Sequence, residues 1–191
     1  MTRPLGVILA GGAATRMGGG DKCLREIGGR PILSHVIDRL TPQVDEIALN
    51  ANGDPQRFAE YDLPVLPDSL PDRPGPLAGV LAGLDWAAKR GAEQIVTVAA
   101  DTPFFPGDLV AQLMAKDAPL VLAASPSGRH PTFGLWPVAL RDDLRAALLE
   151  GTRKIVLWTD AHGGKVAEFP DDDAFFNVNT PEDLARAEGL A

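Results

Sequence analysis

The sequence predicts an α/β fold, a three-layer sandwich in which helices cover both faces of a mostly parallel β-sheet. Short apolar segments of strand length alternate with longer amphipathic segments along most of the chain, and this alternation is typical of the fold class. The apolar segments carry almost no charge, as expected when both faces of a sheet are buried. The 191 residues fit a single domain over 1–191, because domains most often contain roughly 100–200 residues.

The predicted strands are short apolar runs. Leu5–Leu9 and Ile95–Ala100 are uninterrupted by charge, whereas Thr132–Trp136 alternates in polarity. The other predicted strands are Ile47–Asn50, Val65–Leu66 and Leu120–Ala124. The pattern over 153–173 is ambiguous, and we expect a short helix there, followed by a strand near Lys165–Phe169.

The predicted helices have recognisable ends. Pro31–Leu40 begins with proline, whose missing N–H costs nothing in a first turn. Pro76–Arg90 stops before Gly91, which is expected to form its C-terminal cap. Pro181–Ala187 follows Thr180, a favourable N-cap residue. The remaining predicted helices are Leu109–Lys116 and Leu140–Leu149.

The charge distribution limits the partners. A net charge of −8 argues against nucleic acid or a membrane surface, which attract basic proteins. Residues 1–30 carry a net positive charge instead, with five cations against two anions, so an anionic ligand is expected near them. Cys23 is the only cysteine, which excludes an internal disulfide or a cysteine-based zinc cluster. Because no apolar run approaches the roughly 18 residues of a membrane helix and no signal-peptide cleavage region is visible, a cytoplasmic protein is expected.

Polar side chains stand at the carboxyl ends of the first four predicted strands. They are Arg16 and Lys22 after the first strand, Asn50 and Asn52 at the second, Asp68 after the third and Asp101 after the fourth. In open α/β sheets, ligands bind beyond the carboxyl ends of the strands. One edge of the sheet is therefore expected to gather two cations, two amides and two carboxylates.

The loop after the first strand is rich in glycine, reading L-A-G-G-A-A-T-R-M-G-G-G-D-K from Leu9 to Lys22. Glycines let backbone N–H groups approach phosphate oxygens, and nearby cations neutralise the charge. A Walker A loop is excluded because no glycine directly precedes Lys22, and the pattern G-x-G-x-x-G is also missing. We predict a phosphate-binding loop of another kind; the alternative is a surface loop without a ligand.

This loop and later motifs resemble the nucleotidyltransferases that build activated cofactors and sugars, and most closely the bacterial molybdenum cofactor guanylyltransferases. The matching motifs are the loop at 9–22, N-A-N at 50–52, D-S-L at 68–70, P-G-P-L-A-G at 74–79, D-T-P at 101–103, H-P-T at 130–132 and N-V-N-T-P-E at 177–182. The resemblance spans most of the chain and is weakest over 138–175. It implies a Rossmann-like fold of the nucleotidyltransferase type, with an N-terminal nucleotide-binding part and a C-terminal acceptor-binding part.

The resemblance implies a nucleotide site for GTP, formed by Leu9, Ala10, Gly11, Gly12, Lys22, Asn50, Asp68 and Asp101. The form L-A-G-G favours guanylyl members, since cytidylyl relatives tend toward A-A-G. Arg16 and Lys22 would hold the phosphates and act in catalysis by offsetting the charge on leaving pyrophosphate. An acidic side chain suits guanine, whose N1–H and exocyclic amine are adjacent donors. The sequence leaves open whether Asn50 or Asp68 meets the base, and both could be turn residues.

Asp101 is implied as the catalytic ligand of Mg²⁺, which proteins usually hold with one or two carboxylates plus substrate phosphates. A turn or helix-capping carboxylate is the structural alternative. Asn177 and Asn179 would share one face of an extended segment, and we expect both to bind the pterin substrate. His130 is expected to contribute on the same side, although a lone histidine before a strand is more often structural.

The implied reaction transfers GMP from GTP to the terminal phosphate of molybdopterin, which gives molybdopterin guanine dinucleotide and pyrophosphate. One alternative is a cytidylyltransferase or sugar-phosphate nucleotidyltransferase on the same scaffold, and another is a non-catalytic nucleotide-binding or cofactor-handover module. A hydrolase is disfavoured because G-x-S-x-G does not occur. A monomer is expected, with molybdenum-insertion proteins and molybdoenzyme chaperones as protein partners.

Overall fold

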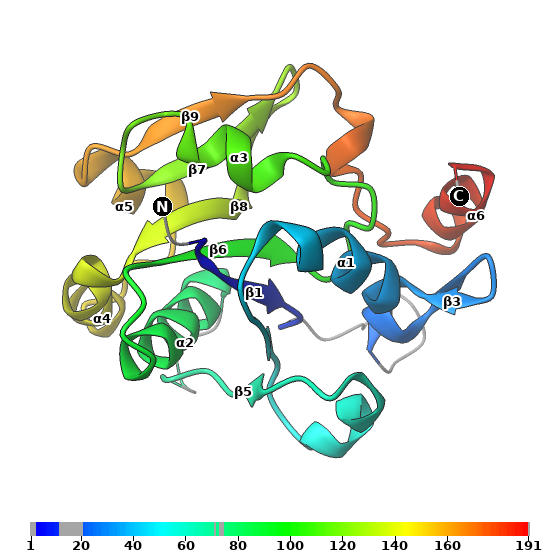
Figure 1. The fold of residues 1–191 in the computed structure, drawn as a ribbon, viewed down its shortest axis with the longest axis horizontal. Coiled ribbons are helices and arrows are strands. Elements are labelled where there is room, and N and C mark those ends of the chain that lie inside the picture. The colour runs from blue at the N-terminus through cyan, green and yellow to red at the C-terminus, as the bar shows by residue number, and fades with distance from the viewer. Residues whose placement is uncertain (1–2, 12–20, 71, 73–74, 191) are drawn as a thin grey trace.

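The computed structural model describes residues 3–11, 21–70, 72 and 75–190. Its centre is a seven-stranded sheet with the spatial order β5-β4-β1-β6-β8-β7-β9 (Figure 1). The strands are β1 (Leu5–Leu9), β4 (Ile47–Asn50), β5 (Val65–Leu66), β6 (Gln94–Ala99), β7 (Val121–Ser125), β8 (Gly128–Pro137) and β9 (Lys165–Glu168). All six strands predicted from apolar runs are present, and β9 confirms the strand expected in the ambiguous segment.

The sheet is mostly parallel, as predicted. β1 pairs in parallel with β4 on one side and with β6 on the other, and the pairs β4–β5 and β7–β9 are also parallel. Only β8 among the seven strands runs against its neighbours, β6 and β7. Leu9 is in register with Asn50 and with Ala99, so the carboxyl ends of the three central strands lie at one edge.

β8 is longer than the predicted strand, which started at Thr132. It begins at Gly128, because β7 and β8 form a hairpin in which Ser125 pairs with Gly128. Gly128 has a φ of 132°, which favours glycine. The first residues of β8 are polar, so no apolar run marks them as part of a strand.

Helices cover both faces of the sheet. They are α1 (Ile32–Leu40), α2 (Pro76–Lys89), α3 (Leu109–Met114), α4 (Arg141–Leu149), α5 (Ile155–Ala161) and α6 (Pro181–Leu190). One hydrophobic core joins α1 and α3 to sheet residues such as Ile8 and Val96. The other joins α2, α4 and α5 to Val7 and Ile95. Successive strand residues point to opposite faces, so the adjacent Val7 and Ile8 serve different cores, and the predicted three-layer sandwich is confirmed.

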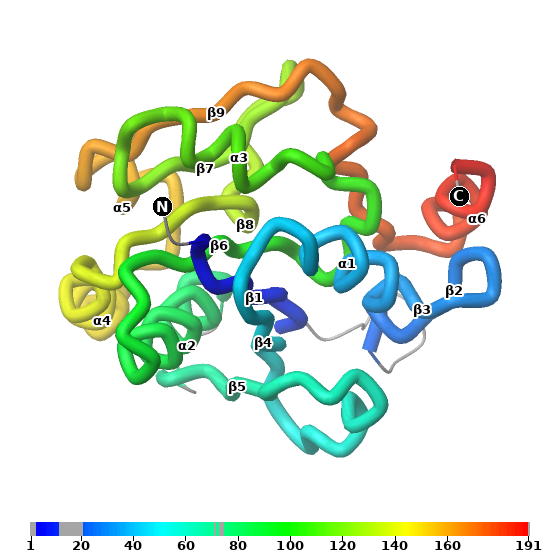
Figure 2. Tube along the Cα trace, in the orientation of Figure 1, coloured from blue at the N-terminus to red at the C-terminus, as the bar shows by residue number. Residues whose placement is uncertain are grey.

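A small hairpin precedes α1 and was not predicted. Its strands are β2 (Glu26–Ile27) and β3 (Arg30–Pro31). Gly28 and Gly29 form the turn with φ values of 59° and 75°. Pro31 therefore belongs to β3, and α1 begins at Ile32, one residue after the predicted start. Helix α6 lies beside this hairpin at the C-terminal end of the chain (Figure 2).

Two predicted helix ends are confirmed in detail. Gly91 has a φ of 68° and donates its N–H to the carbonyl of Ala88 at 3.2 Å, which closes α2. At the start of α6, the hydroxyl of Thr180 accepts the N–H of Asp183 at 3.1 Å. The carboxylate of Asp183 in turn accepts the N–H groups of Thr180 and Asn179 at 2.9 and 3.0 Å. These reciprocal hydrogen bonds form a capping box that fixes the backbone just before the helix.

Helix α2 lies very close to the sheet. A Cβ atom on Gly79 would stand 2.2 Å from the side-chain oxygen of Asn50, and one on Gly83 would stand 2.8 Å from Val7. Glycine is therefore required at both positions for this approach. The contact at Gly79 brings the first turns of α2 over the end of β4.

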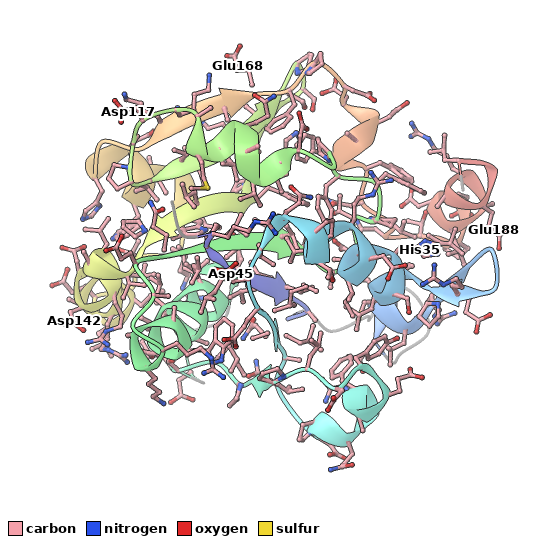
Figure 3. The ribbon with its side chains drawn as sticks, in the orientation of Figure 1. His35, Asp45, Asp117, Asp142, Glu168 and Glu188 are labelled. Atoms are coloured by element: carbon pink, nitrogen blue, oxygen red, sulfur yellow. The ribbon has the colours of Figure 1, made fainter. Side chains whose placement is uncertain are left out.

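Charged side chains such as Asp142, Glu168 and Glu188 lie on the outside of the molecule (Figure 3). The charges on β9 discourage edge-to-edge pairing with another sheet. Within the described part of the chain, every helix is too short or too polar to span a membrane.

Candidate functional site

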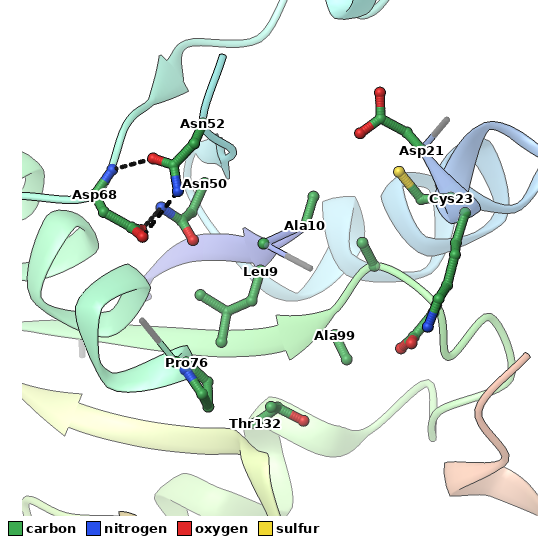
Figure 4. A pocket seen from close by; sticks show the side chains of 15 residues that line it. Leu9, Ala10, Asp21, Cys23, Asn50, Asn52, Asp68, Pro76, Ala99 and Thr132 are labelled. Atoms are coloured by element: carbon green, nitrogen blue, oxygen red, sulfur yellow. Dashed lines mark hydrogen bonds between the residues drawn. The ribbon is translucent and has the colours of Figure 1, made fainter. Parts of the chain in front are cut away.

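A cavity of about 470 Å³ opens at the carboxyl ends of β1, β4 and β6 (Figure 4). Its lining contains every predicted nucleotide-site residue that the structure describes: Leu9, Ala10, Gly11, Lys22, Asn50, Asp68 and Asp101. Gly12 and Arg16 lie outside the described residues. The position of the cavity agrees with the rule that open α/β sheets bind ligands at this edge.

One end of the cavity has small, mostly apolar walls. Leu9 and Ala10 leave the end of β1, and Gly75 and Pro76 approach from the start of α2. Gly75 has a φ of 121°, a conformation that favours glycine. With alanine at position 10 and glycine at position 75, these walls leave room for a flat group, such as a nucleobase with its ribose, between them.

A polar network forms the wall beside this apolar end. Asp68 accepts one hydrogen bond from the side-chain amide of Asn50 and another from that of Asn52, both at 2.9 Å (Figure 4). The backbone N–H of Asp68 donates to the side-chain oxygen of Asn52 at 2.8 Å. The amide of Asn50 also donates to the carbonyl of Leu66 at 3.0 Å. Asn50 is 2% exposed, whereas Asp68 is only half-buried and Asn52 is exposed, so the carboxylate is the anionic group best placed to meet a ligand.

The other end of the cavity holds the charged groups. Asp101 follows β6, and burial raises the pKa of its carboxyl above the usual range, while Lys22 and the hydroxyl of Thr102 oppose that rise. Lys22 begins a 3-10 helix, Lys22–Leu24, and is half-buried. A buried carboxylate with a raised pKa is a group whose charged form a bound cation would stabilise.

The donor set suits Mg²⁺ better than a metal that needs a dense protein cage. Among the described residues, no group of three or more His, Cys, Asp and Glu side chains stands ready to hold a metal. Mg²⁺ usually retains waters and takes one or two carboxylates plus substrate phosphates. Asp101 lies beside Lys22 in the same cavity, where it could share such an ion with a triphosphate.

The segment 177–179 returns from the far end of the chain to this charged end. The ammonium of Lys22 donates to the side-chain oxygen of Asn179 at 2.9 Å, and the hydroxyl of Thr102 donates to that of Asn177 at 2.5 Å. Between them, Val178 is fully buried and donates its N–H to the carbonyl of Asp101 at 2.8 Å. The two asparagines thus contact the end of β6 and the start of the 3-10 helix, on the opposite side of the segment from Val178.

His130 lies outside the cavity lining but supports this segment. Its ring stacks on Phe175 with centroids 4.1 Å apart, and its Nε2 lies 2.7 Å from the hydroxyl of Ser125. That hydroxyl also donates to Asp172. Burial lowers the pKa of His130, and Asp172 partly opposes the change. In the described contacts His130 therefore holds the chain that leads to Asn177.

Asp21 and Thr132 line the cavity, and Arg57 contacts Asp21 beside it; none of the three was among the predicted site residues. Arg57 lies on the 3-10 helix Pro55–Tyr61, with its Nε 2.6 Å from the carboxylate of Asp21. Its Nη2 donates to the backbone carbonyl of Asn52 at 2.5 Å. Thr132 adds a wall from β8. The irregular helix and the contact between residues 21 and 57 leave no periodic signal in the sequence, whereas Thr132 stands in the H-P-T motif at 130–132.

Cys23 also lines the cavity. It is 4% exposed, and burial raises the pKa of its thiol to about 12, with a smaller contribution from Asp21. At neutral pH the thiol stays protonated. Since the thiolate is the nucleophilic form, Cys23 acts as a small apolar wall.

Comparison with known proteins gives full-length relatives. The model of the MobA-like NTP transferase domain matches residues 6–164. A protein named molybdenum cofactor guanylyltransferase from Bradyrhizobium sp. (strain ORS 278) is 55% identical, with 97% of this chain and 92% of that protein covered. Another of the same name from Cereibacter sphaeroides is 52% identical, with 98% and 97% covered.

Solved structures share the fold at lower identity. The molybdopterin-guanine dinucleotide biosynthesis protein A of Archaeoglobus fulgidus has a TM-score of 0.76 and 23% identity, with 97% of both chains covered. A 4-diphosphocytidyl-2C-methyl-D-erythritol synthase from Anaerococcus prevotii has a TM-score of 0.75 and 16% identity, covering 99% of this chain and 96% of the other. These two likenesses concern the fold alone. The family match and the identity over nearly the whole chain show that this protein belongs to the MobA-like NTP transferase family.

Proposed function

We propose that this nucleotidyltransferase moves GMP from GTP to the terminal phosphate of molybdopterin, forming molybdopterin guanine dinucleotide. The relatives that are 52–55% identical over nearly the whole chain carry the name molybdenum cofactor guanylyltransferase. The single observation that carries the proposal is the contact of Lys22 with Asn179, beside Asp101, at one end of the cavity. It joins groups suited to a triphosphate to groups suited to an acceptor, as transfer between two substrates requires.

The cavity offers a place for each part of GTP. Guanine would face the carboxylate of Asp68 from the apolar end, because its N1–H and exocyclic amine are adjacent donors. Leu9, Ala10 and Gly11 would lie against the base and ribose. Lys22 would meet the phosphates at the charged end, and Arg16 and Gly12 would join it from the glycine loop. Asp101 would hold Mg²⁺.

The chemistry needs no general base. A phosphate oxygen of the acceptor, already ionised at neutral pH, forms a bond to the α-phosphorus of GTP. The bond from that phosphorus to the bridging oxygen breaks, and pyrophosphate leaves with the electron pair. The difficulty is to bring two anions together in line, so positioning and charge neutralisation carry the catalysis. Lys22 supplies one positive charge, and Mg²⁺ supplies two more when bound.

The acceptor would bind at the segment 177–179. The side-chain oxygens of Asn179 and Asn177 accept hydrogen bonds from Lys22 and Thr102, respectively. Each amide nitrogen still has donors to offer. Two N–H donors on one side of an extended segment suit the anionic phosphate of molybdopterin and the polar edge of its pterin.

Incubation with each of the four nucleoside triphosphates, Mg²⁺ and molybdopterin tests the proposal. We expect pyrophosphate release and a dinucleotide product with GTP. A product with CTP in place of GTP would instead identify a cytidylyltransferase on the same scaffold. Nucleotide binding without pyrophosphate release would identify a non-catalytic binding module.

A further inference from the structure

Both polar atoms of the exposed side chain of Asn52 form a hydrogen bond with one neighbour, Asp68. Its oxygen accepts the backbone N–H of Asp68 at 2.8 Å, and its amide nitrogen donates to the carboxylate of Asp68 at 2.9 Å. Figure 4 shows both hydrogen bonds beside the one from Asn50. One amide therefore holds the backbone and the side chain of Asp68 together, although 16 positions separate the two residues in the sequence.

The hydrogen bonds that Asn50 and Asn52 donate to Asp68 fix the plane of its carboxylate. The terminal torsion of an aspartate is broad and weakly restrained by its own rotamer preferences. In this site, Asn50 donates to one carboxylate oxygen and Asn52 to the other. Each oxygen keeps further acceptor capacity. The carboxylate is thus held as a two-point acceptor before any ligand arrives.

We propose that Asn52 is a positioning residue that sets the preference of the site for guanine by fixing the carboxylate of Asp68. The inference rests on the proposed function, in which Asp68 receives N1–H and the exocyclic amine of guanine. A pair of parallel hydrogen bonds depends on the plane of the acceptor, so loss of Asn52 affects recognition of both donors together. Asn52 acts through Asp68 rather than on the reacting phosphates.

Asn52 allows a cleaner test than Asn50 does. Asn50 is 2% exposed and its oxygen is pressed against Gly79, so its removal would leave a cavity under α2. The side chain of Asn52 is exposed, and its backbone carbonyl is held separately by Arg57. Truncation at position 52 removes the two hydrogen bonds to Asp68 and leaves this backbone contact in place.

The test compares GTP with ITP, whose base lacks the exocyclic amine. In Asn52→Ala we expect KM for GTP to rise about tenfold with little change in kcat, because hydrogen bonds to a charged group each contribute measurably to binding. KM for ITP should rise less, so the preference for GTP over ITP falls. Asn52→Asp should lose more than Asn52→Ala, since a second carboxylate would face Asp68. Gln56→Ala, an exposed amide on the neighbouring 3-10 helix, serves as the matched control and should behave as wild type.

A double-variant cycle shows whether Asn52 acts through Asp68. Equilibrium binding of GTP and ITP is measured for Asn52→Ala, Asp68→Ala and the double variant. If the proposal holds, Asn52→Ala has no further effect on the GTP preference once Asp68 is gone. Additive losses would overturn it, because Asn52 would then touch the base directly.

Two further results would also overturn the inference. An unchanged KM for GTP and an unchanged preference for GTP over ITP in Asn52→Ala would show that the hydrogen bonds of Asn52 to Asp68 do not contribute to guanine recognition. Equal losses for GTP and ITP, together with a lowered kcat or unfolding midpoint, would show a general structural role. Failure of the proposed function looks different, because the wild-type protein itself would then not use GTP.

Discussion

At the scale of single residues, Asp101 combines a proposed role in holding Mg²⁺ with a cost to the stability of the fold. Its carboxyl is buried and its pKa is raised, with Lys22 only partly opposing the effect of burial. Because the pKa in the folded state lies above that in the unfolded state, the stability linked to this group is fully present below the unfolded pKa. That stability is lost as the pH rises through the folded pKa. Ionisation of this carboxyl, as the pH rises through its folded pKa, therefore destabilises the ligand-free protein.

Replacement of Asp101 by asparagine should separate these two effects. Asp101→Asn keeps the shape and cannot ionise, so we expect its advantage in unfolding midpoint over the ligand-free wild type to grow as the pH rises through the folded pKa of Asp101. Transfer activity should fall by about 1,000-fold or more, since charge stabilisation by a catalytic metal ion contributes several kcal/mol and about 1.4 kcal/mol is tenfold in rate. Thermal unfolding and pyrophosphate release measure the two outcomes. Near-normal activity with Mg²⁺ would contradict the proposed metal role.

Lys22 lies between the proposed triphosphate site and the proposed acceptor site. Its ammonium has three donors, of which one is given to Asn179, so it can hold Asn179 and a phosphate at once. We expect Asn179→Ala to weaken GTP binding about three- to tenfold even without acceptor, because the long lysine side chain loses the contact that orders it. Asn177→Ala is the matched comparison, since its oxygen accepts from Thr102 instead. Calorimetric titration with GTP measures the affinity of both variants. Equal affinities would contradict the idea that Asn179 supports GTP binding through Lys22.

The residues that could be predicted are those at the ends of apolar strands. Asp68 and Asp101 stand out because a charged residue follows an uncharged run, and the sheet rule brings the strand ends together. The hydrogen bonds of Asn52 with Asp68 and the ion pair of Arg57 with Asp21 could not be predicted in the same way. They join loops and an irregular 3-10 helix, whose path follows from packing rather than from any periodicity.

At the scale of elements, apolar periodicity predicted the strands of the central sheet well and the hairpins poorly. β1 and β6 are buried on both faces, so an apolar run is all that defines them. The hairpins of β2 with β3 and of β7 with β8 are short or polar, and they depend on glycine turns. In a two-residue strand the pattern is too short to distinguish it from a loop.

Helix α2 gives an element-scale prediction through Gly79. A methyl group there would stand 2.2 Å from the oxygen of Asn50, so Gly79→Ala should push the helix or the asparagine away. We expect a loss of about 1–3 kcal/mol in unfolding free energy, as for other overpacked sites, together with weaker GTP binding. Gly189→Ala in α6 is the control, since no described atom beyond the neighbouring residues and backbone of its own helix lies within 4 Å of its added methyl group, and it should be neutral or slightly stabilising. Denaturant titration of both variants checks the prediction, which fails if Gly79→Ala is as stable as wild type and binds GTP equally well.

At the scale of the whole molecule, the site assembles from parts that are distant in the sequence. Lys22 and Asn179 are 157 positions apart, and the cavity joins the carboxyl ends of three strands to the first turn of α2. The alternation of strands and helices predicts which strand ends lie at one edge. It does not predict that the segment before α6 returns to β6, because that return depends on the burial of Val178 and the capping box of Asp183.

Because one ligand would contact so many elements, GTP with Mg²⁺ should stabilise the molecule against global unfolding. A ligand at about 100 times its dissociation constant contributes about 2.7 kcal/mol, which corresponds to a rise of about 5–10 °C in the unfolding midpoint for a chain of this size. CTP at the same concentration should give a smaller shift, since cytosine does not offer Asp68 the adjacent N1–H and exocyclic amine of guanine.

Removal of Mg²⁺ with EDTA should reduce the GTP shift in wild type but leave it nearly unchanged in Asp101→Asn, which has already lost the carboxylate proposed to hold the ion. A shift with GTP that does not depend on Mg²⁺ in the wild-type protein would mean that Lys22 and the backbone hold the triphosphate without a metal at Asp101.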